Sequence, residues 1–195
     1  LANERLAVEV TERKQAEEKV YQLSITDELS GLLNRRGFDL LAEQALKTAR
    51  RAKSELTLIY ADLDGLKRVN DELGHQAGDT MIIETAQLLR KSFRESDLVA
   101  RLGGDEFAVL AVSTDSPESM LARLEKSVVQ VNKSGSLPFR LSFSSGHVQC
   151  LQHGEKSLPE LLADADARMY VQKQERRRAA TATAPAADLS LRQAN

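Results

Sequence analysis

Four acidic side chains lie where apolar runs of the chain give way to polar ones, at Asp62, Asp64, Asp105 and Glu106. Asp62 and Asp64 end the run ELTLIYADLD, and because side chains alternate along a strand they point to the same face. Oxygen ligands suit a hard divalent cation such as Mg²⁺, which keeps its remaining positions for water or phosphate oxygens. Since Lys67 follows closely, the segment predicts a site for a metal–phosphate complex.

The second acidic pair belongs to RLGGDEFAVL, residues 101–110, where two glycines separate two apolar runs. Gly103 and Gly104 allow backbone angles closed to other residues and leave room for a ligand against the main chain. Adjacent carboxylates repel each other unless a cation is shared, so we expect Asp105 to share a metal with Asp62. The DLD segment alone is also typical of turn or helix-capping chemistry, and that explanation stays open.

The hydrophobic periodicity indicates the elements that must position these side chains. Residues 55–64 carry apolar side chains on both faces, which indicates a central strand buried on both sides. Residues 101–110 predict a strand, a tight turn and a second strand, and residues 138–146 predict a further strand. Helical spacing of apolar residues marks helices around 38–49, 82–93, 121–131 and 158–169. This mixture predicts an α+β sheet with helices packed on it.

The composition excludes several classes of protein. A chain of 195 residues with 42% hydrophobic residues is long enough for one domain with a sizeable core. The 27 basic and 29 acidic residues give a net charge of −2, so we expect no nucleic-acid partner and no direct membrane contact. The single cysteine, Cys150, excludes an internal disulfide and suits a cytoplasmic location. No stretch reaches the roughly 18 apolar residues of a membrane span.

The two ends of the chain differ from the middle. Residues 1–25 lack Gly and Pro and carry a thin apolar seam at helical spacing. They predict a linker helix that pairs with a second copy as a coiled coil, or a helix that lies on its own domain. Residues 179–195 are small, polar and aperiodic, which predicts a disordered tail. Because the chain begins at Leu1, we expect a sensor domain upstream, and any membrane anchor of the intact protein would lie there.

Several motifs together resemble one known family. GGDEF at 103–107 is the signature of the GGDEF family of diguanylate cyclases. DELSGLLNRRGF at 27–38 is similar to the opening motif of that family, with Ser30 where Thr is more usual. Four further segments resemble the other motifs of the family, in the same order along the chain: DLDGLKRVNDELGHQAGD, RESDLVARLGGDEF, SFSSG and DADARMYVQK. The resemblance covers residues 26–178, which we take as the domain.

The resemblance implies a fold and an activity. The fold would be a central, mostly antiparallel five-stranded sheet surrounded by helices, preceded by residues 1–25 as a signalling helix. The activity would be the Mg²⁺-dependent condensation of two GTP molecules into cyclic di-GMP with release of two pyrophosphates, with Mn²⁺ as an alternative ion. Because each domain would hold one GTP, the resemblance also implies a homodimer.

The resemblance also assigns roles to single residues. The metal ligands would be Asp62, the backbone carbonyl of Leu63 and Asp105, while Asp64 matches without a direct metal bond. Asp105 would accept the proton of the attacking 3′-hydroxyl, with Glu106 beside it and Lys67 stabilising charge in the transition state. The substrate contacts would be Gly103, Gly104, Asn70, His75, Asp79, Lys173 and Arg177, of which Asn70 and Asp79 would read guanine. Arg94 and Asp97 of RESD would form an inhibitory site for the product.

Some alternatives stay open at this stage. His75 could be a loop histidine bonded only to backbone, and RESD could be an exposed ion pair at a strand start. Arg176–Arg178 stand where the family usually has Gly-Arg-Asn, so Arg177 could be one cation among three on a solvated helix end. The whole domain could be a catalytically silent module that binds GTP or cyclic di-GMP and signals by protein contacts. A template-directed nucleotidyl transferase is disfavoured, since no extended basic, aromatic groove is indicated.

Overall fold

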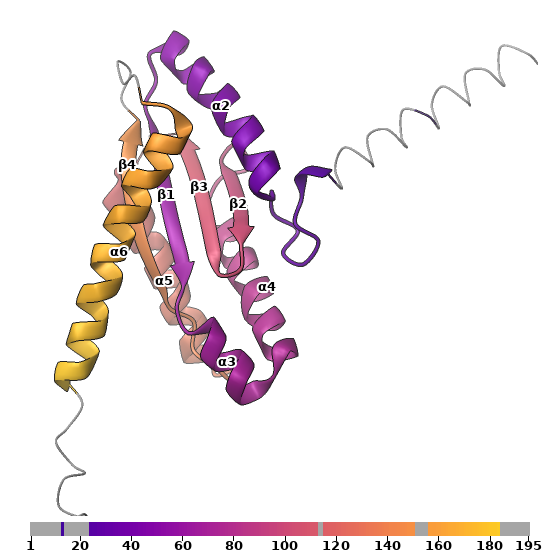
Figure 1. The fold of residues 1–195 in the computed structure, drawn as a ribbon, viewed down its shortest axis with the longest axis vertical. Coiled ribbons are helices and arrows are strands. Elements are labelled where there is room, and N and C mark those ends of the chain that lie inside the picture. The colour runs from indigo at the N-terminus through magenta and orange to yellow at the C-terminus, as the bar shows by residue number, and fades with distance from the viewer. Residues whose placement is uncertain (1–12, 14–23, 113–114, 151–155, 184–195) are drawn as a thin grey trace, which may run out of the picture.

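A computed structural model describes residue 13 and residues 24–112, 115–150 and 156–183, with the side chains of residue 177 and residues 179–183 outside that description. The expected linker helix therefore lies almost wholly outside the described residues, as does the expected tail beyond residue 183. The described elements are α2 (Arg35–Ala52), β1 (Leu56–Leu63), α3 (Leu66–Leu73), α4 (His75–Ser92), β2 (Leu98–Gly103), β3 (Glu106–Val112), α5 (Pro117–Ser134), β4 (Phe143–Cys150) and α6 (Leu158–Thr183) (Figure 1).

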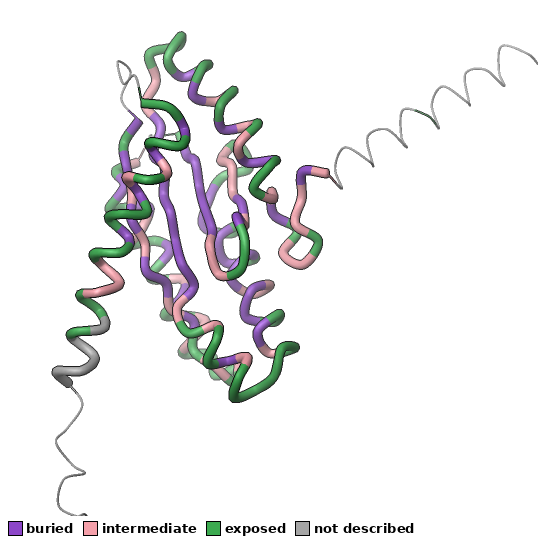
Figure 2. Tube along the Cα trace, in the orientation of Figure 1, coloured by how far each residue is buried: buried purple, intermediate pink, exposed green. Residues whose placement is uncertain are grey.

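The strands form one antiparallel sheet in the order β2-β3-β1-β4. β1 lies between β3 and β4, and every residue of it is buried, as its apolar alternation on both faces predicts. On one face, α4 and α5 pack on Ile59, Leu63 and Phe107. On the other face, α2 and α6 pack on Leu58 and Ala108. The predicted α+β class is therefore confirmed, and Figure 2 shows the buried strands enclosed by helices with exposed outer surfaces.

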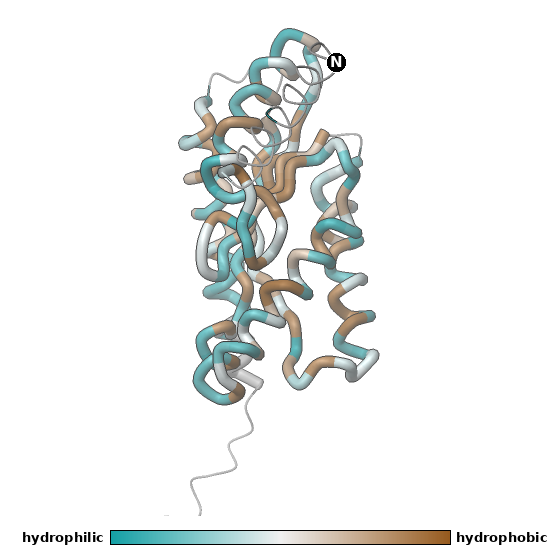
Figure 3. Tube along the Cα trace, turned by 90° about the vertical axis from the view of Figure 1, so that its right-hand side faces the viewer, coloured by the Kyte–Doolittle hydropathy of each residue, from teal (hydrophilic) through white to brown (hydrophobic). Residues whose placement is uncertain are grey.

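Hydropathy follows the same layers. In Figure 3 the helices alternate between brown and teal along their length. Alternation of this kind is typical of helices that bury one face against a sheet and leave the other in water. No helix in the described part of the chain is long and apolar enough to span a membrane.

The sheet has four strands within the described residues, so the five-stranded sheet expected from the resemblance is wrong in that detail. The sequence after residue 175 does account for the length of the last helix. Where Gly-Arg-Asn would end a helix, Arg176–Arg178 and the two alanines that follow are good helix formers. α6 consequently continues to Thr183, and the boundary expected at residue 178 falls inside this helix.

Glycines flank α3, the short helix that follows β1. Gly65 has φ 82° and turns the chain out of β1, and Gly74 has φ 87° and separates α3 from α4. Both angles are in the left-handed region that glycine adopts without strain. α3 buries only Val69, so the hydrophobic periodicity does not indicate it. This turn places the polar side chains of α3 directly beyond the end of β1.

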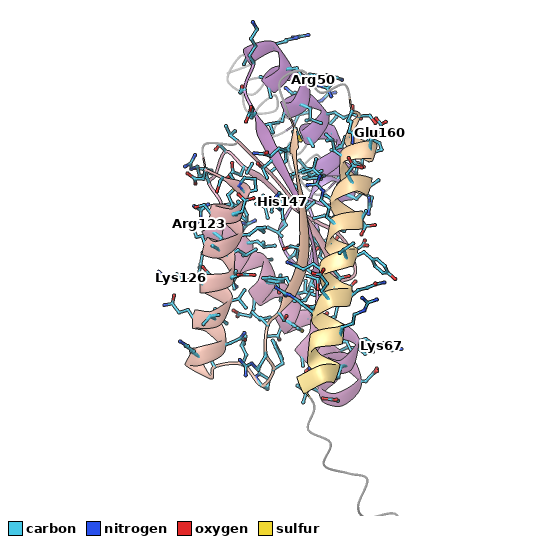
Figure 4. All side chains as sticks on the ribbon, turned by 90° about the vertical axis from the view of Figure 1, so that its left-hand side faces the viewer. Arg50, Lys67, Arg123, Lys126, His147 and Glu160 are labelled. Carbon is cyan, nitrogen blue, oxygen red and sulfur yellow. The ribbon has the colours of Figure 1, made fainter. Side chains whose placement is uncertain are left out.

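α6 packs on β4 with almost no space between the two backbones. A Cβ on Gly146 would lie 2.1 Å from the carbonyl oxygen of Ala165 and 2.3 Å from the backbone nitrogen of Met169. Because Ser142 O accepts from Asp64 N on the β1 side, the backbone groups of residues 143, 145 and 147 face away from β1. Three α6 side chains bond to these outer groups: Arg168 donates to His147 O, Gln172 accepts from Ser145 N, and Arg176 donates to Phe143 O (Figure 4 labels His147).

Candidate functional site

Several of the residues predicted to bind metal and phosphate lie at the carboxyl end of β1. A pocket of about 1200 Å³ opens there, lined by the tip of the β2–β3 hairpin, the start of α3, α5 and the later turns of α6. Its lining includes Asp62, Leu63, Asp105, Lys67 and Lys173 (Figure 4 labels Lys67). The fold therefore brings together residues that the sequence analysis selected from three separate parts of the chain.

Asp62 and Asp105 approach each other because the hairpin pairs with β1. In the β1–β3 ladder Asp62 lies opposite Glu106, and the N–H of Leu63 donates to the carbonyl oxygen of Asp105 over 2.8 Å. Lys173 Nζ lies 2.6 Å from Asp62 Oδ1. Burial raises the pKa of Asp62, and the charge of Asp105 raises it further, against the hydrogen bond from Lys173 that lowers it. The rise in pKa comes first from burial, and the neighbouring Asp105 carboxylate marks a place where a cation would be stabilised.

The donor set suits a hard divalent cation whose coordination a ligand completes. The carboxylates of Asp62 and Asp105 and the carbonyl of Leu63 are oxygen donors of the kind that Mg²⁺ prefers. Within the described residues, no group of three or more His, Cys, Asp or Glu side chains could hold a metal ion. Two carboxylates and one carbonyl fill only part of the coordination shell of Mg²⁺, which leaves positions for water or phosphate oxygens.

Asp64 is engaged by protein groups. Ser142 Oγ and Ser144 Oγ each donate to one of its carboxylate oxygens over 2.9 Å. Arg176 Nη1 lies 3.8 Å from Asp64 Oδ2. Because both oxygens accept hydrogen bonds from β4 and the residue before it, Asp64 joins the end of β1 to β4.

Glu106 turns toward α2 and is not among the residues that line the pocket. Its carboxylate accepts from the hydroxyl of Tyr60, and Arg35 Nη2 lies 3.8 Å from Glu106 Oε2. Arg35 is placed by the start of α2, where Asn34 caps the helix by accepting from Gly37 N. Burial raises the pKa of Tyr60, and the charge of Glu106 adds to that effect. Glu106 is therefore held beside Asp62 by two side chains that the sequence analysis did not select, Tyr60 and Arg35.

The tip of the β2–β3 hairpin is exposed to solvent, and Arg101 fixes its position. Gly103 (φ 153°) and Gly104 (φ 49°) are exposed, and a Cβ on either would meet no atom within 4 Å. Arg101 Nε donates to Gly104 O over 3.0 Å, and Arg101 Nη1 lies 3.1 Å from Asp27 Oδ1. Burial acts to raise the pKa of Asp27, but hydrogen bonds from Ser30 and the Arg101 guanidinium outweigh it and lower the pKa. The opening motif thus fixes the hairpin that carries the second acidic pair.

The residues predicted to read guanine lie on α3 and α4, outside the lining of the pocket. Asn70 Oδ1 lies 1.8 Å from the position that a Cβ on Gly78 would take, so the missing side chain lets the Asn70 amide rest on α4. The fold therefore brings Asn70 next to the residue before Asp79. His75 is exposed and is the first residue of α4, so it belongs to a helix rather than a loop.

RESD lies at the opposite end of β2 from the hairpin. Asp97 Oδ2 accepts from Arg94 N over 2.9 Å, and Asp97 Oδ1 accepts from Val112 N over 3.3 Å. Arg94 Nη2 lies 3.7 Å from Asp115 Oδ2, and the Arg94 side chain is 53% exposed. Asp97 therefore closes the turn with Oδ2 and joins it to the end of β3 with Oδ1, while the guanidinium of Arg94 is accessible to a ligand.

The end of α6 differs from the sequence-based selection. The side chain of Arg177 lies outside the described residues, so its phosphate contact stays a prediction. Arg176, which was not selected, lines the pocket together with Lys173. The two are three residues apart on α6, and this spacing, which puts side chains on one helix face, is the signal that could have identified Arg176. Ser142 and Ser144 gave no such signal, because their contact with Asp64 depends on the pairing of distant strands.

Comparisons with known proteins identify the family. The family model for the diguanylate cyclase GGDEF domain matches residues 24–179. Among curated proteins, diguanylate cyclase TpbB of Pseudomonas aeruginosa is 40% identical over 158 residues, which cover 77% of this chain and 35% of TpbB. Among solved structures, the coiled coil and GGDEF domain of DgcB from Caulobacter crescentus, in complex with c-di-GMP, matches with a TM-score of 0.77 at 26% identity. That match covers 87% of this chain and 91% of the DgcB chain.

A second solved structure is the GGDEF domain of TpbB alone, which matches with a TM-score of 0.65 at 35% identity over 77% of this chain and 89% of that chain. The fold and the pocket define an α+β domain with a metal-compatible polar site at the end of its central strand. The family match makes the class specific: this chain belongs to the GGDEF family of diguanylate cyclase domains. It spans about a third of the length of TpbB, the curated relative described above.

Proposed function

We propose that the chain is the catalytic domain of a diguanylate cyclase, which condenses two GTP molecules into cyclic di-GMP and releases two pyrophosphates. The observation that carries the proposal is the meeting of Asp62 and Asp105 in a pocket that also contains Lys67 and Lys173. Paired carboxylates with cations beside them suit a triphosphate bound together with a divalent ion. The similarity to TpbB, a named diguanylate cyclase, supports the same assignment.

The residues divide the work of binding and reaction. Asp62, Asp105 and the Leu63 carbonyl would hold Mg²⁺, with Mn²⁺ as an alternative ion, and the ion would neutralise charge on the triphosphate. Lys173 donates a hydrogen bond to Asp62. When the triphosphate binds, the Lys173 ammonium would turn to a phosphate oxygen. Lys67, near the start of α3, stabilises charge on the phosphates in the transition state. Asp105 accepts the proton of the attacking 3′-hydroxyl, and Glu106 adds a second negative charge beside Asp105.

Guanine is read by the pair on α3 and α4. The amide of Asn70 meets the acceptor edge of the purine, and the carboxylate of Asp79 accepts from its N–H donors. Adenine lacks that donor pattern, so it would leave Asp79 without a partner. His75 contacts the substrate from the start of α4, and Gly103 and Gly104 leave space for the nucleotide against the hairpin backbone.

Catalysis by this route requires two domains. Each pocket holds one GTP, and the 3′-hydroxyl of one nucleotide must attack the α-phosphate of the other in line with the departing pyrophosphate. We therefore propose a homodimer about a two-fold axis, with residues 1–25 setting the approach of the two pockets. The DgcB structure, which contains a coiled coil with its GGDEF domain, supports this reading of the linker. A sensor domain upstream would act through the same helix.

Arg94 and Asp97 are proposed as an inhibitory site for cyclic di-GMP. The exposed guanidinium of Arg94 can stack on guanine and fork to a phosphate, while Asp97 keeps the turn closed. The Arg94→Ala variant should bind added cyclic di-GMP at least about ten-fold more weakly and should lose inhibition by it. Unchanged affinity and unchanged inhibition would remove the site.

The central test is incubation of the chain with GTP and Mg²⁺ or Mn²⁺, followed by chromatography for cyclic di-GMP. Light scattering on the same samples gives the fraction of dimer. We expect product from dimeric wild type and none from Asp62→Asn or Asp105→Asn. A dimeric sample that binds GTP and forms no product would identify the silent module instead and would refute the catalytic assignment.

A further inference from the structure

Arg176 connects three parts of the domain at the wall of the pocket. Nη1 donates to the carbonyl oxygen of Phe143 and lies 3.8 Å from Asp64 Oδ2. Nη2 lies 3.4 Å from Glu125 Oε1 on α5. The Arg176 side chain is 41% exposed and lines the pocket, as Lys173 does. The guanidinium is therefore fixed in position and still accessible to a molecule that enters the pocket.

The contacts of Arg176 differ in how firmly they hold it. The Phe143 carbonyl is a neutral acceptor, so it anchors the side chain without cancelling its charge. Asp64 already accepts from two serine hydroxyls and is only one partner of several. The Glu125 side chain is 67% exposed, and ion pairs as exposed as this one add little to stability. Glu125 is therefore the partner that Arg176 can exchange at the least cost.

The charges that line the pocket show what such an exchange would serve. The described lining carries six acidic side chains, at 62, 64, 71, 72, 105 and 125, and five basic ones, at 67, 68, 140, 173 and 176. The side chains of the pocket thus offer no excess of positive charge to a polyanion. Each accessible basic side chain therefore contributes to the binding of a triphosphate. Lys173 and Arg176 share one face of α6, so they can contact neighbouring phosphates of one chain.

We propose that Arg176 is a phosphate-binding residue of the GTP pocket and that Glu125 is the partner it releases when the triphosphate binds. This rests on the proposed function, since it assumes that the pocket takes GTP. The guanidinium offers parallel N–H donors that match phosphate oxygens, and a triphosphate carries more charge than the carboxylate it replaces. Arg176 thereby supplies a further α6 cation for the triphosphate, in addition to Lys173.

The first experiment measures binding rather than turnover. The probe is a GTP analogue with a methylene group between the α- and β-phosphates, added with Mg²⁺ in a calorimeter, and GMP is the second probe. Arg176→Ala should weaken binding of the analogue about ten-fold. GMP lacks the outer phosphates, so its affinity should not change. Arg176→Lys keeps the charge and should recover part of the lost affinity for the analogue.

Two further variants separate a phosphate contact from a purely structural role. Glu125→Gln removes the competing carboxylate, so it should strengthen binding of the analogue; if Arg176 only tied α6 to α5, this variant would instead weaken binding as Arg176→Ala does. Arg168→Ala is the matched control, because Arg168 donates to a β4 carbonyl in the same way but lies outside the lining of this pocket. It should leave the affinity for the analogue unchanged.

The possible results discriminate between the two levels of the proposal. Wild type that binds neither probe would overturn the proposed function and this inference with it. Wild-type affinity in Arg176→Ala would overturn only the role of Arg176. Equal losses for the analogue and GMP, or a parallel loss in Arg168→Ala, would assign Arg176 to the packing of α6 and would likewise refute phosphate binding.

Discussion

Gly78→Ala is the sharpest available perturbation of the guanine-reading pair. The added Cβ would stand 1.8 Å from Asn70 Oδ1 and 2.8 Å from Asn70 Cγ, whereas ordinary van der Waals contact begins at 3.4 Å. The amide must therefore leave its place on α4. Asn70 is a half-buried side chain that can rotate, and Ala is favoured over Gly inside a helix by about 0.5–1 kcal/mol. We consequently expect little change in the free energy of unfolding.

The loss should appear in nucleotide affinity instead. If the displaced amide forfeits two hydrogen bonds to guanine at about 1 kcal/mol each, the dissociation constant of the methylene GTP analogue rises roughly 30-fold. Calorimetry on wild type, Gly78→Ala, Asn70→Ala and the double variant measures this, with urea unfolding as the control for stability. Because the clash acts through Asn70, Gly78→Ala should cost nothing more in the Asn70→Ala background. An unchanged dissociation constant, or losses that add in the double variant, would refute the reasoning.

Three further outcomes follow from contacts described above. Asp27→Asn should lower the free energy of unfolding by about 2 kcal/mol at neutral pH in urea titrations. Because folding lowers the pKa of Asp27, this stabilisation is present above the ordinary aspartate pKa of about 3.9 and is lost as the pH falls through the lowered value, so wild type and variant should converge in acid; a gap that persists there would contradict the ion pair. Gly146→Ala should cost about 3 kcal/mol, since its Cβ would meet the backbone of α6, and near-wild-type stability would show that this packing is looser. Deletion of residues 1–25 should reduce cyclase activity more than analogue binding, and equal loss of both, or of neither, would count against the linker as the dimerisation device.

Local patterns were sufficient for most of the fold. Apolar residues on both faces of 55–64 predict a central strand, and β1 is one, because a strand covered by helices on both sides has no polar face. The hairpin was equally predictable from two glycines between apolar runs. α3 was missed, since a helix of eight residues with Val69 as its single buried residue leaves no periodic signal. The expected fifth strand is not found among the described residues, and α6 continues through the helix formers after Glu175.

The same distinction holds for the site: contacts that follow from short motifs could be predicted, and contacts that depend on the pairing of distant strands could not. Asp62 and Asp105 could be expected to meet, because both carboxylates follow from short motifs at strand ends. The contact of Glu106 with Tyr60 could not, since it depends on the register that sets β3 beside β1 and on which face each residue then occupies. The hydroxyls around Asp64 come from nearly 80 residues further along the chain, and no spacing rule in the sequence links them.

The three α6 side chains that bond to the outer edge of β4 have a consequence for solubility. An uncovered strand edge is a template on which another chain can add a strand, and natural proteins guard against this with covering elements and charged side chains. In this domain α6 both covers the edge of β4 and lines the pocket, because it also carries Lys173 and Arg176. A change that loosens α6 would therefore expose an aggregation-prone edge and remove cations from the pocket at once. In this domain, loss of nucleotide binding and loss of solubility should appear together.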